Sequence, residues 1–446
     1  MSRHESFAFT SKADLFQKAQ ELGIQLPFID TISTLFKPIS LGEKKILNRL
    51  AVQPMEGYDA NQNGSPSELT FRRYSRYAEG GSGLIWFEAT SVASDGRSNP
   101  HQLLLNAQNL DSFKQLVENT RQCGYRAFGN GHSIFLVLQL THSGRYSKPE
   151  GKPRPQVAAF NPYLDKEKED VYILSDEELD SLQDTYVEAS RLAYKAGYDA
   201  VDIKACHGYL LNELLAARTR KNSRYGESFE NRIRFIREVI RKIHDEGSGI
   251  YLAVRLNAYD GIPYPYSFGV AEDGSLRVDL TEPKSLIRRL VNDGCSFFNI
   301  TIGNPFLNPH FGRPFGRPLP GAFLPKEHPL EGVARLIKIT GELQREIPKI
   351  PLVGTGYTWL RHFFPHVAAA VISREEASLV GLGRSSFAYP NAPKELMNKG
   401  SLDPNKACIT CSRCTELMRG GHVSGCAIRD KEIYGEEYKK LLQERK

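Results

Sequence analysis

The stretch SDEELDSLQDTYVEASRLAYKAGYDAVDIKA, residues 175–205, contains a helix-forming run, a glycine and a strand-forming run in that order. Ser175 and Glu178 have the spacing of a capping box, which predicts that a helix begins here. Gly197 comes directly after the apolar periodicity and predicts the end of that helix, because glycine adopts the left-handed C-cap conformation without strain. The run 200–205 then has the apolar, β-branched character of a buried strand.

The same alternation of helix and strand recurs along most of the chain. Strands are expected at 49–55, 83–93, 134–141, 200–205, 251–256, 296–302, 352–354 and 378–382. Helices are expected between most of them, at 110–122, 175–196, 229–244, 282–292, 330–347 and 357–369. Eight buried strands alternating with helices predict a (β/α)8 TIM barrel, an α/β fold. An open doubly wound sheet is the alternative, but no GxGxxG turn follows a first strand.

The composition is that of a globular protein with a large core. Of 446 residues, 40% are hydrophobic, and 58 basic residues against 52 acidic ones leave a net charge of +6. No block of five like charges occurs, so nucleic-acid binding is not indicated. The apolar run 367–372 is far shorter than the roughly 20 residues of a membrane span, and the N-terminus lacks a signal-peptide core. We therefore expect a cytoplasmic protein without membrane contact.

Three parts of the chain are distinguished by their pattern. They are an N-terminal extension at 1–34 with an amphipathic stretch at 12–22, a barrel at 35–400 and a cysteine-containing segment at 401–446. The stretch 12–22 predicts an extra packing helix. Two long loops, 143–173 and 303–324, interrupt the alternation of strands and helices. Loops of this length are usually functional, so we expect the first to be a lid and both to influence specificity.

Four of the seven cysteines lie within nineteen residues near the C-terminus. Cys408, Cys411, Cys414 and Cys426 have the spacing C-x2-C-x2-C-x11-C. An odd total and such clustering favour a ligand set in a reducing compartment over a disulfide framework. Four thiolates suit a [4Fe–4S] cluster or zinc, and spacing alone does not separate these from each other. The remaining cysteines, Cys123, Cys206 and Cys295, are expected to be buried packing residues.

Five stretches together resemble a known enzyme family. They are LFKPISLGEKKILNRLAVQPM at 35–55, GLIWFEAT at 83–90, LVLQLTHSGR at 136–145, HGYLLNELLAARTRKNSRYGESFENR at 207–232 and VGLGRSSFAYP at 380–390. In content and order they resemble the Old Yellow Enzyme family of NADH:flavin oxidoreductases over residues 35–395. With the cysteine spacing added, the chain is most similar to the barrel part of 2,4-dienoyl-CoA reductase and trimethylamine dehydrogenase. Those proteins continue into nucleotide-binding domains, which we expect to be missing here because the sequence ends at Lys446.

The resemblance implies an FMN cofactor at the mouth of the barrel and, by analogy, a [4Fe–4S] cluster at the four cysteines. Gln139 has an amide suited to the pyrimidine edge of the flavin, and Arg255 would place a positive charge near N1 and O2. Phosphate binding after the last two strands is expected from backbone amides and an arginine. The other implied FMN residues are Pro54, Met55, Ala89, Gly354, Gly356, Gly383 and Arg384.

The segment Lys204-Ala-Cys-His207-Gly-Tyr209 is where the family commonly has His-x-x-His or His-x-x-Asn, a pair that holds the substrate carbonyl oxygen. Here Lys204 replaces the first histidine, and an ammonium can stabilise an enolate or bind a carboxylate. The resemblance implies that Tyr209 delivers a proton to the substrate, with His310 as a second candidate.

The expected activity is therefore FMN-dependent reduction of an activated C=C bond in a small-molecule substrate such as an enone, enoate or dienoyl compound. Electrons would come from NADH or NADPH, or singly from a carrier protein through the cluster. One alternative is an amine dehydrogenase or demethylase that passes electrons out through the cluster. Another is a non-catalytic flavin- or zinc-binding subunit. The sequence does not determine the oligomeric state, and an oligomer is possible.

Overall fold

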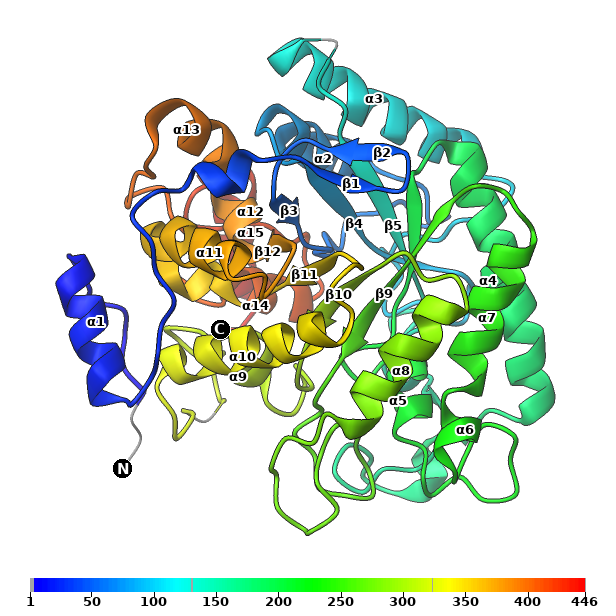
Figure 1. Cartoon of the computed structure of the whole chain (residues 1–446). Helices are drawn as coiled ribbons and strands as arrows, with labels where there is room; N and C mark the ends of the chain where they lie inside the picture. The colour runs from blue at the N-terminus through cyan, green and yellow to red at the C-terminus, as the bar shows by residue number, and fades with distance from the viewer. Residues whose placement is uncertain (1–3, 130, 323, 446) are drawn as a thin grey trace.

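Eight parallel strands form a closed barrel at the centre of the computed structural model (Figure 1). They follow one another around the barrel in chain order as β3 (Leu50–Val52), β4 (Leu84–Ser91), β5 (Phe135–Thr141), β8 (Ala200–Ile203), β9 (Tyr251–Asn257), β10 (Phe297–Thr301), β11 (Leu352–Gly354) and β12 (Leu379–Leu382). Every strand expected from the sequence is present. The TIM-barrel prediction is confirmed, and the alternative of an open sheet is wrong.

The structure describes residues 4–129, 131–322 and 324–445. Residues 1–3 of the expected N-terminal extension, residue 323 of the second long loop and residue 446 of the cysteine segment lie outside the described residues.

Helices surround the barrel on its outer side (Figure 1). The main ones are α2 (Glu68–Glu79), α3 (Leu110–Phe128), α4 (Asp176–Ala196), α7 (Arg234–Asp245), α8 (Thr281–Asn292), α10 (Pro329–Glu346) and α11 (Phe364–Ser373). The predicted caps of α4 are confirmed, since Ser175 accepts a hydrogen bond from the Glu178 amide and Gly197 has φ 94°. The expected helix 229–244 is divided into α6 (Phe229–Arg232) and α7, and the expected helix 357–369 starts as the 3-10 turn η4 (Tyr357–Phe363).

A short hairpin closes the N-terminal end of the barrel. Its strands β1 (Ile39–Leu41) and β2 (Lys44–Ile46) were not predicted, because only the last residue of each is buried and neither forms an apolar run. Leu41 and Ile46 pack with Trp86 in the apolar layer inside the barrel. The hairpin leaves the C-terminal ends of the strands as the accessible end.

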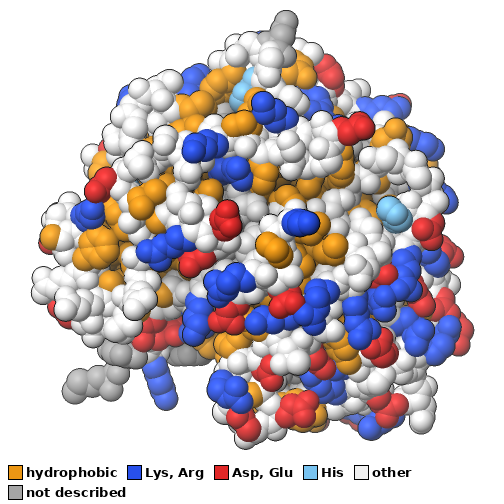
Figure 2. All heavy atoms as spheres, in the orientation of Figure 1, with side chains coloured by type: hydrophobic (Ala, Val, Ile, Leu, Met, Phe, Trp, Pro, Cys, Tyr) orange, Lys and Arg blue, Asp and Glu red, His pale blue; other side chains and the backbone are white. Residues whose placement is uncertain are grey.

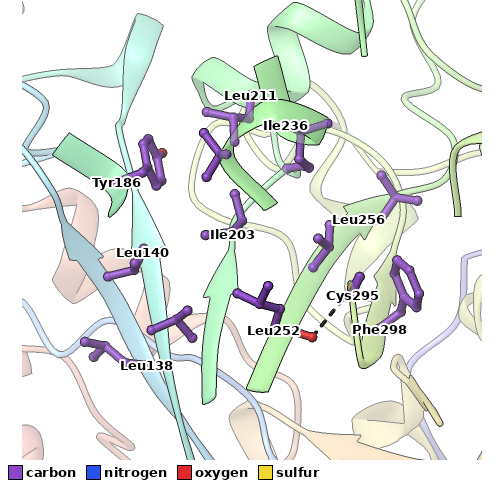
Figure 3. Close-up of a cluster of buried hydrophobic side chains, with 14 of the residues drawn as sticks. Leu138, Leu140, Tyr186, Ile203, Leu211, Ile236, Leu252, Leu256, Cys295 and Phe298 are labelled. Atoms are coloured by element: carbon purple, nitrogen blue, oxygen red, sulfur yellow. Dashed lines mark hydrogen bonds between the residues drawn. The ribbon is translucent and has the colours of Figure 1, made fainter. Parts of the chain in front are cut away.

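A second apolar layer lies between the strands and the outer helices (Figure 3). Leu140 and Ile203 project from β5 and β8, while Tyr186 and Ile236 reach this layer from α4 and α7. Cys295 lies in the same layer, where its thiol donates to the Leu252 carbonyl at 3.6 Å. Its role as a packing residue agrees with the prediction.

The N-terminal extension contains the expected packing helix, α1 (Lys12–Glu21). Leu15 and Ala19 are buried in one cluster with Val367 of α11. Phe7 contacts Trp359 edge-on, with ring centroids 5.3 Å apart. Among the described helices, none is long and apolar enough to cross a membrane.

The C-terminal segment folds back over the open end of the barrel. It follows α13 (Ala392–Lys399) and contains α14 (Arg413–Arg419), the π-helical turn η5 (Lys431–Gly435) and α15 (Glu436–Glu444). Asp430 joins it to α2 by accepting hydrogen bonds from Arg72, at 2.7 Å, and from Arg76. The Ser424 amide also donates to the Gly57 carbonyl at 2.6 Å, next to β3.

The loop 143–173, which we expected to be a lid, is attached to the barrel by a buried ion-pair network. It contains β6 (Gln156–Val157) and β7 (Tyr172–Ile173). Arg145 pairs with Asp165 at 2.9 Å and with Glu213 of α5 (Leu210–Leu215) at 3.0 Å. These contacts hold the beginning of the loop against α5 and connect the beginning to the segment around Asp165.

A second buried network connects α2 with the loop after β3. Arg73 donates to Asp59 at 2.5 Å and also to Glu88, and its side chain is only 3% exposed. Glu88 in turn accepts from the Gly57 amide at 2.9 Å. Helix α2 was missed from the sequence because its buried face includes this arginine, Thr70 and Tyr74 instead of an aliphatic stripe.

Replacement of Arg73 tests the importance of this network for stability. Arg73→Met leaves Asp59 and Glu88 buried without a positive partner, so we expect a loss of about 3–5 kcal/mol in the free energy of unfolding. The matched control is Arg241→Met, because Arg241 is half-exposed and shares Asp293 with Arg237. It should lose less than about 1 kcal/mol. Urea denaturation measures both, and equal losses would contradict the assignment.

Candidate active site and cysteine site

A cavity of about 700 Å³ opens at the C-terminal ends of the barrel strands. It is lined by most of the residues that the sequence assigned to FMN or to catalysis. These are Pro54 and Met55 after β3, Gln139 on β5, Lys204, His207 and Tyr209 after β8, Arg255 on β9, Gly356 after β11, and Gly383 and Arg384 after β12. Closure of the barrel therefore brings residues from 54 to 384 to one site.

Asp202 on β8 forms hydrogen bonds that position Gln139 and the backbone of Arg255. Its Oδ2 accepts hydrogen bonds from Gln139 Nε2 at 2.6 Å and from Trp86 Nε1 at 2.8 Å, and its Oδ1 accepts from the Arg255 amide at 2.5 Å. Burial raises the pKa of Asp202 to about 6, and these hydrogen bonds oppose the rise. Because Gln139 Nε2 is engaged, its Oε1 is left as the acceptor available to the cavity.

Three arginines that line the cavity, Arg255, Arg313 and Arg384, carry unsatisfied donors. Arg255 Nε and Arg384 Nη1 are buried without a hydrogen-bond partner among the described residues, while Arg384 Nη2 donates to the Pro314 carbonyl at 2.7 Å. Buried donors are normally paired, so these two atoms indicate a missing acceptor. An electron-rich heterocycle edge at Arg255 and a phosphate at Arg384 would satisfy them, which fits FMN.

A left-handed turn directs the segment after β8 into the cavity. His207 has φ 64° and Gly208 has φ 74°. A side chain at Gly208 would lie 2.3 Å from Asn304 Nδ2, so the position requires glycine. His207 Nε2 is 3.2 Å from Thr301 Oγ1. Burial, assisted by neighbouring cations, lowers the pKa of His207 well below its usual range, so the imidazole is neutral.

Glu56 joins Lys204 and Tyr209 in a compact group. Lys204 Nζ lies 3.5 Å from the centroid of the Tyr209 ring and 3.8 Å from Glu56 Oε1. The Tyr209 hydroxyl donates to Glu56 Oε1 at 3.4 Å. Burial raises the pKa of Tyr209 well above its usual range, and burial lowers that of Lys204. The sequence analysis missed Glu56, although a carboxylate directly after the first strand was a signal for it.

Three expected site residues do not line the cavity. The Ala89 carbonyl accepts from Gln102 Nε2 at 3.0 Å, and Gly354 lies within β11. His310, on α9 (Pro309–Gly312), is 1% exposed and packs edge-on against Phe315, with ring centroids 5.0 Å apart. Because α9 directs its ring toward this contact, the structure does not bring His310 to the cavity as an alternative proton donor.

The four clustered cysteines converge on a smaller cavity. Cys408, Cys411, Cys414 and Cys426 line it together with Arg384, Phe387, Arg413 and Arg429. Burial raises the pKa of Cys408 to about 12 and that of Cys426 to about 11. In the part of the chain that the structure describes, no group of three or more His, Cys, Asp or Glu side chains could hold a single metal ion. The other cysteines, Cys123, Cys206 and Cys295, are buried as predicted.

Comparisons with known proteins agree on one family for this chain. Residues 34–268, more than half of the chain, match the NADH:flavin oxidoreductase / NADH oxidase family. An NADPH dehydrogenase of Bacillus cytotoxicus is 31% identical over 232 residues, which cover 51% of this chain and 63% of the relative. An NADH oxidase of Thermoanaerobacter brockii is 27% identical over 387 residues, or 85% of this chain and 52% of the relative. The chain thus spans less than two thirds of the length of these curated relatives.

Solved structures share the fold. A 2-naphthoyl-CoA reductase complex superimposes with a TM-score of 0.71 at 20% identity, covering 91% of this chain and 58% of that one. An old yellow enzyme homologue from Zymomonas mobilis superimposes with a TM-score of 0.62 at 23% identity. The match covers 83% of this chain and 94% of that one. The family match and the barrel agree with the resemblance found in the sequence, and the chain belongs to the NADH:flavin oxidoreductase / NADH oxidase family, that of old yellow enzyme.

Proposed function

We propose that this chain is an FMN-dependent oxidoreductase that reduces an activated C=C bond and exchanges electrons through a [4Fe–4S] cluster on its four C-terminal cysteines. One observation carries the proposal. Arg384, Phe387 and Cys414 line both the large cavity and the cysteine cavity, so a cofactor in each would be separated only by a wall of side chains. A flavin and a cluster placed this way are suited to one-electron exchange.

The unsatisfied donors support the placement of FMN. Arg384 and the backbone around Gly383 would bind the phosphate, and Arg255 and Gln139 would bind the pyrimidine edge. With its Oε1 free, Gln139 is suited to accept a hydrogen bond from the flavin N3–H. The side of the cavity lined by Tyr58 and Tyr146 would remain open to substrate.

Four converging thiols suit either a [4Fe–4S] cluster or zinc, and the family resemblance found in the sequence is what favours the cluster. Zinc binds four thiolates at about 2.3 Å from one centre, which requires a tight set of sulfur atoms. The four cysteines line a common cavity, as either group requires. A [4Fe–4S] cube is larger and takes one thiolate at each of its four irons.

Bound reduced FMN would supply a hydride to the substrate. Lys204 and His207 would donate hydrogen bonds to the electron-withdrawing oxygen of the substrate and stabilise the charge that develops there. Tyr209, whose phenol is protonated at neutral pH, would deliver a proton to the α-carbon. Glu56 holds the Tyr209 hydroxyl and the Lys204 ammonium in position.

The charge of the cavity supports an electron-poor or anionic substrate. Glu56 is its one carboxylate among the described residues, whereas its basic residues are Lys148, Lys204, Arg255, Arg313, Arg384 and Arg419. A protonated amine would be repelled by this lining, so the amine dehydrogenase alternative is less well supported. NADH or NADPH, or a one-electron carrier protein, would supply the electrons.

Anaerobic purification followed by an absorption spectrum and iron and sulfide assays tests the cofactor assignment. We expect flavin bands with about four iron and four sulfide per chain. Cys411→Ser should remove most iron and sulfide while the flavin stays bound. Cys123→Ser, on α3 and outside both cavity linings, is the control and should retain the cluster. Zinc in place of iron would contradict the cluster assignment, and absence of flavin would contradict the whole proposal.

The proton-donor assignment is tested by removing one hydroxyl. Tyr209→Phe should slow oxidation of the reduced flavin by 2-cyclohexenone or a 2-enoate by about 10²–10⁴-fold, measured by stopped-flow absorbance, while flavin reduction stays within about twofold. Glu56→Gln should give a smaller loss in the same step. Tyr198→Phe is the control, because the Tyr198 hydroxyl is buried and has no hydrogen-bond partner among the described residues. If Tyr209→Phe behaves like this control with every substrate tested, Tyr209 is not the donor.

The role of Asp202 is tested through FMN affinity. Asp202→Asn removes the charged acceptor that orients Gln139, so we expect the Kd for FMN to rise about tenfold, since a hydrogen bond to a charged group contributes about 1.5–3 kcal/mol. Quenching of FMN fluorescence on titration with apoprotein measures this Kd. Asp293→Asn, which removes an ion-pair partner of Arg237 and Arg241 on the outer helices, should leave it unchanged.

A further inference from the structure

We propose that the surface beside the cysteine site is the docking surface for a small acidic protein that carries a one-electron centre. The inference rests on the proposed function, because it assumes that a cluster occupies the four cysteines. We call the surface the arginine rim and define it by Arg317, Arg361, Arg413 and Arg429.

The rim lies directly around the thiols. Arg413 and Arg429 line the cysteine cavity itself. Arg361 is close enough to interact electrostatically with Cys408, Cys411 and Arg429. Arg317 is adjacent through its backbone, since its amide donates to the Thr410 carbonyl at 3.3 Å and its carbonyl accepts from Ser412 Oγ at 2.8 Å.

The rim is open to solvent. Arg317 and Arg429 are exposed, and Arg361 and Arg413 are partly exposed. Cys408 and Cys411 are themselves partly exposed, so a cluster held by them would lie close to the surface. A partner bound here would bring its own redox centre near that cluster.

The charge of the rim is uncompensated. Within the described residues no carboxylate lies within 4.0 Å of any of its four guanidinium groups. They contact neutral groups instead. Arg361 lies over the Phe7 ring at 4.4 Å, Arg413 lies over the Tyr438 ring at 4.9 Å, and Arg429 donates to the Ala407 carbonyl at 3.2 Å.

Other basic residues of the molecule are commonly paired. Glu395 on α13 pairs with Lys399 at 3.3 Å and Lys406 at 2.5 Å, and on the face shown in Figure 2 Lys and Arg side chains are mixed with Asp and Glu. Unpaired like charges repel one another and are retained where an external anion neutralises them. A protein with an acidic surface around its redox centre supplies that complement.

The electron balance of the exchange is simple. Each reduced carrier that docks would give one electron to the oxidised cluster and leave oxidised. Two such encounters, with proton uptake from solvent, would provide the two electrons that reduce one substrate C=C bond. The carrier is therefore the reductant, and a nicotinamide is not required for this route.

The test uses holoprotein and a recombinant acidic [2Fe–2S] ferredoxin as the probe. Isothermal titration calorimetry at 20 mM and 300 mM NaCl gives Kd, and stopped-flow spectroscopy gives the rate of electron transfer. Arg317→Glu with Arg361→Glu should raise Kd at least about tenfold at low salt, because the change reverses two charges that face the partner. The added salt should weaken wild-type binding strongly and variant binding little, since the Debye length falls below about 10 Å.

The control is Lys45→Glu with Lys349→Glu. It makes the same change in net charge on two exposed residues, one in β2 and one shortly before β11, at the opposite end of the barrel, and should alter Kd less than twofold. Iron, sulfide and flavin are measured on every variant. Their absence from wild-type protein would overturn the proposed function. If the cofactors are present in full but Kd changes neither with salt nor in the rim variants, the docking-surface proposal is wrong while the proposed function stands.

Discussion

The pairing of β12 with β3 is the interaction on which the rest of the structure depends. Val380 pairs with Leu50 and Leu382 with Val52, which joins the last strand of the barrel to the first. Closure removes both sheet edges, so the backbone groups of the strands are satisfied within the barrel. It also brings the C-terminal ends of all eight strands around one axis. The cavity, and the convergence of distant side chains on it, follow from that constraint.

Buried polar groups then determine how the site is arranged. Asp202 sets the orientation of Gln139 and holds the backbone at Arg255, and Glu88 holds the loop after β3 through the Gly57 amide. Each network is nearly dry, so a carboxylate there is retained only with several partners. The same principle makes the unsatisfied donors of Arg255 and Arg384 informative, because both residues line the cavity, where a bound molecule could supply the acceptor.

The strands could be predicted because their signals are local, and most of the expected site residues line one cavity because they belong to motifs at the ends of those strands. Runs such as 134–141 are apolar throughout, as expected for strands buried on both faces. Helix α2 was missed because its buried face is partly polar. His310 was expected at the cavity from its position after the sixth strand, but the short helix α9 directs its ring into the protein. Glu56 gained a role only through Lys204 and Tyr209, about 150 residues away.

The sequence by itself determined the alternation of strands and helices, the caps of α4, the cysteine spacing and the family, since these depend on neighbouring residues or on ordered motifs. Only the tertiary structure decided that the cysteine cavity shares lining residues with the large cavity, and that Glu56 lies beside Lys204 and Tyr209. It also decided that four arginines near the thiols have no carboxylate partner among the described residues. Those features depend on chain segments that are far apart in sequence. Barrel closure and the return of the C-terminal segment through Asp430 place them together, and no local pattern encodes such distances.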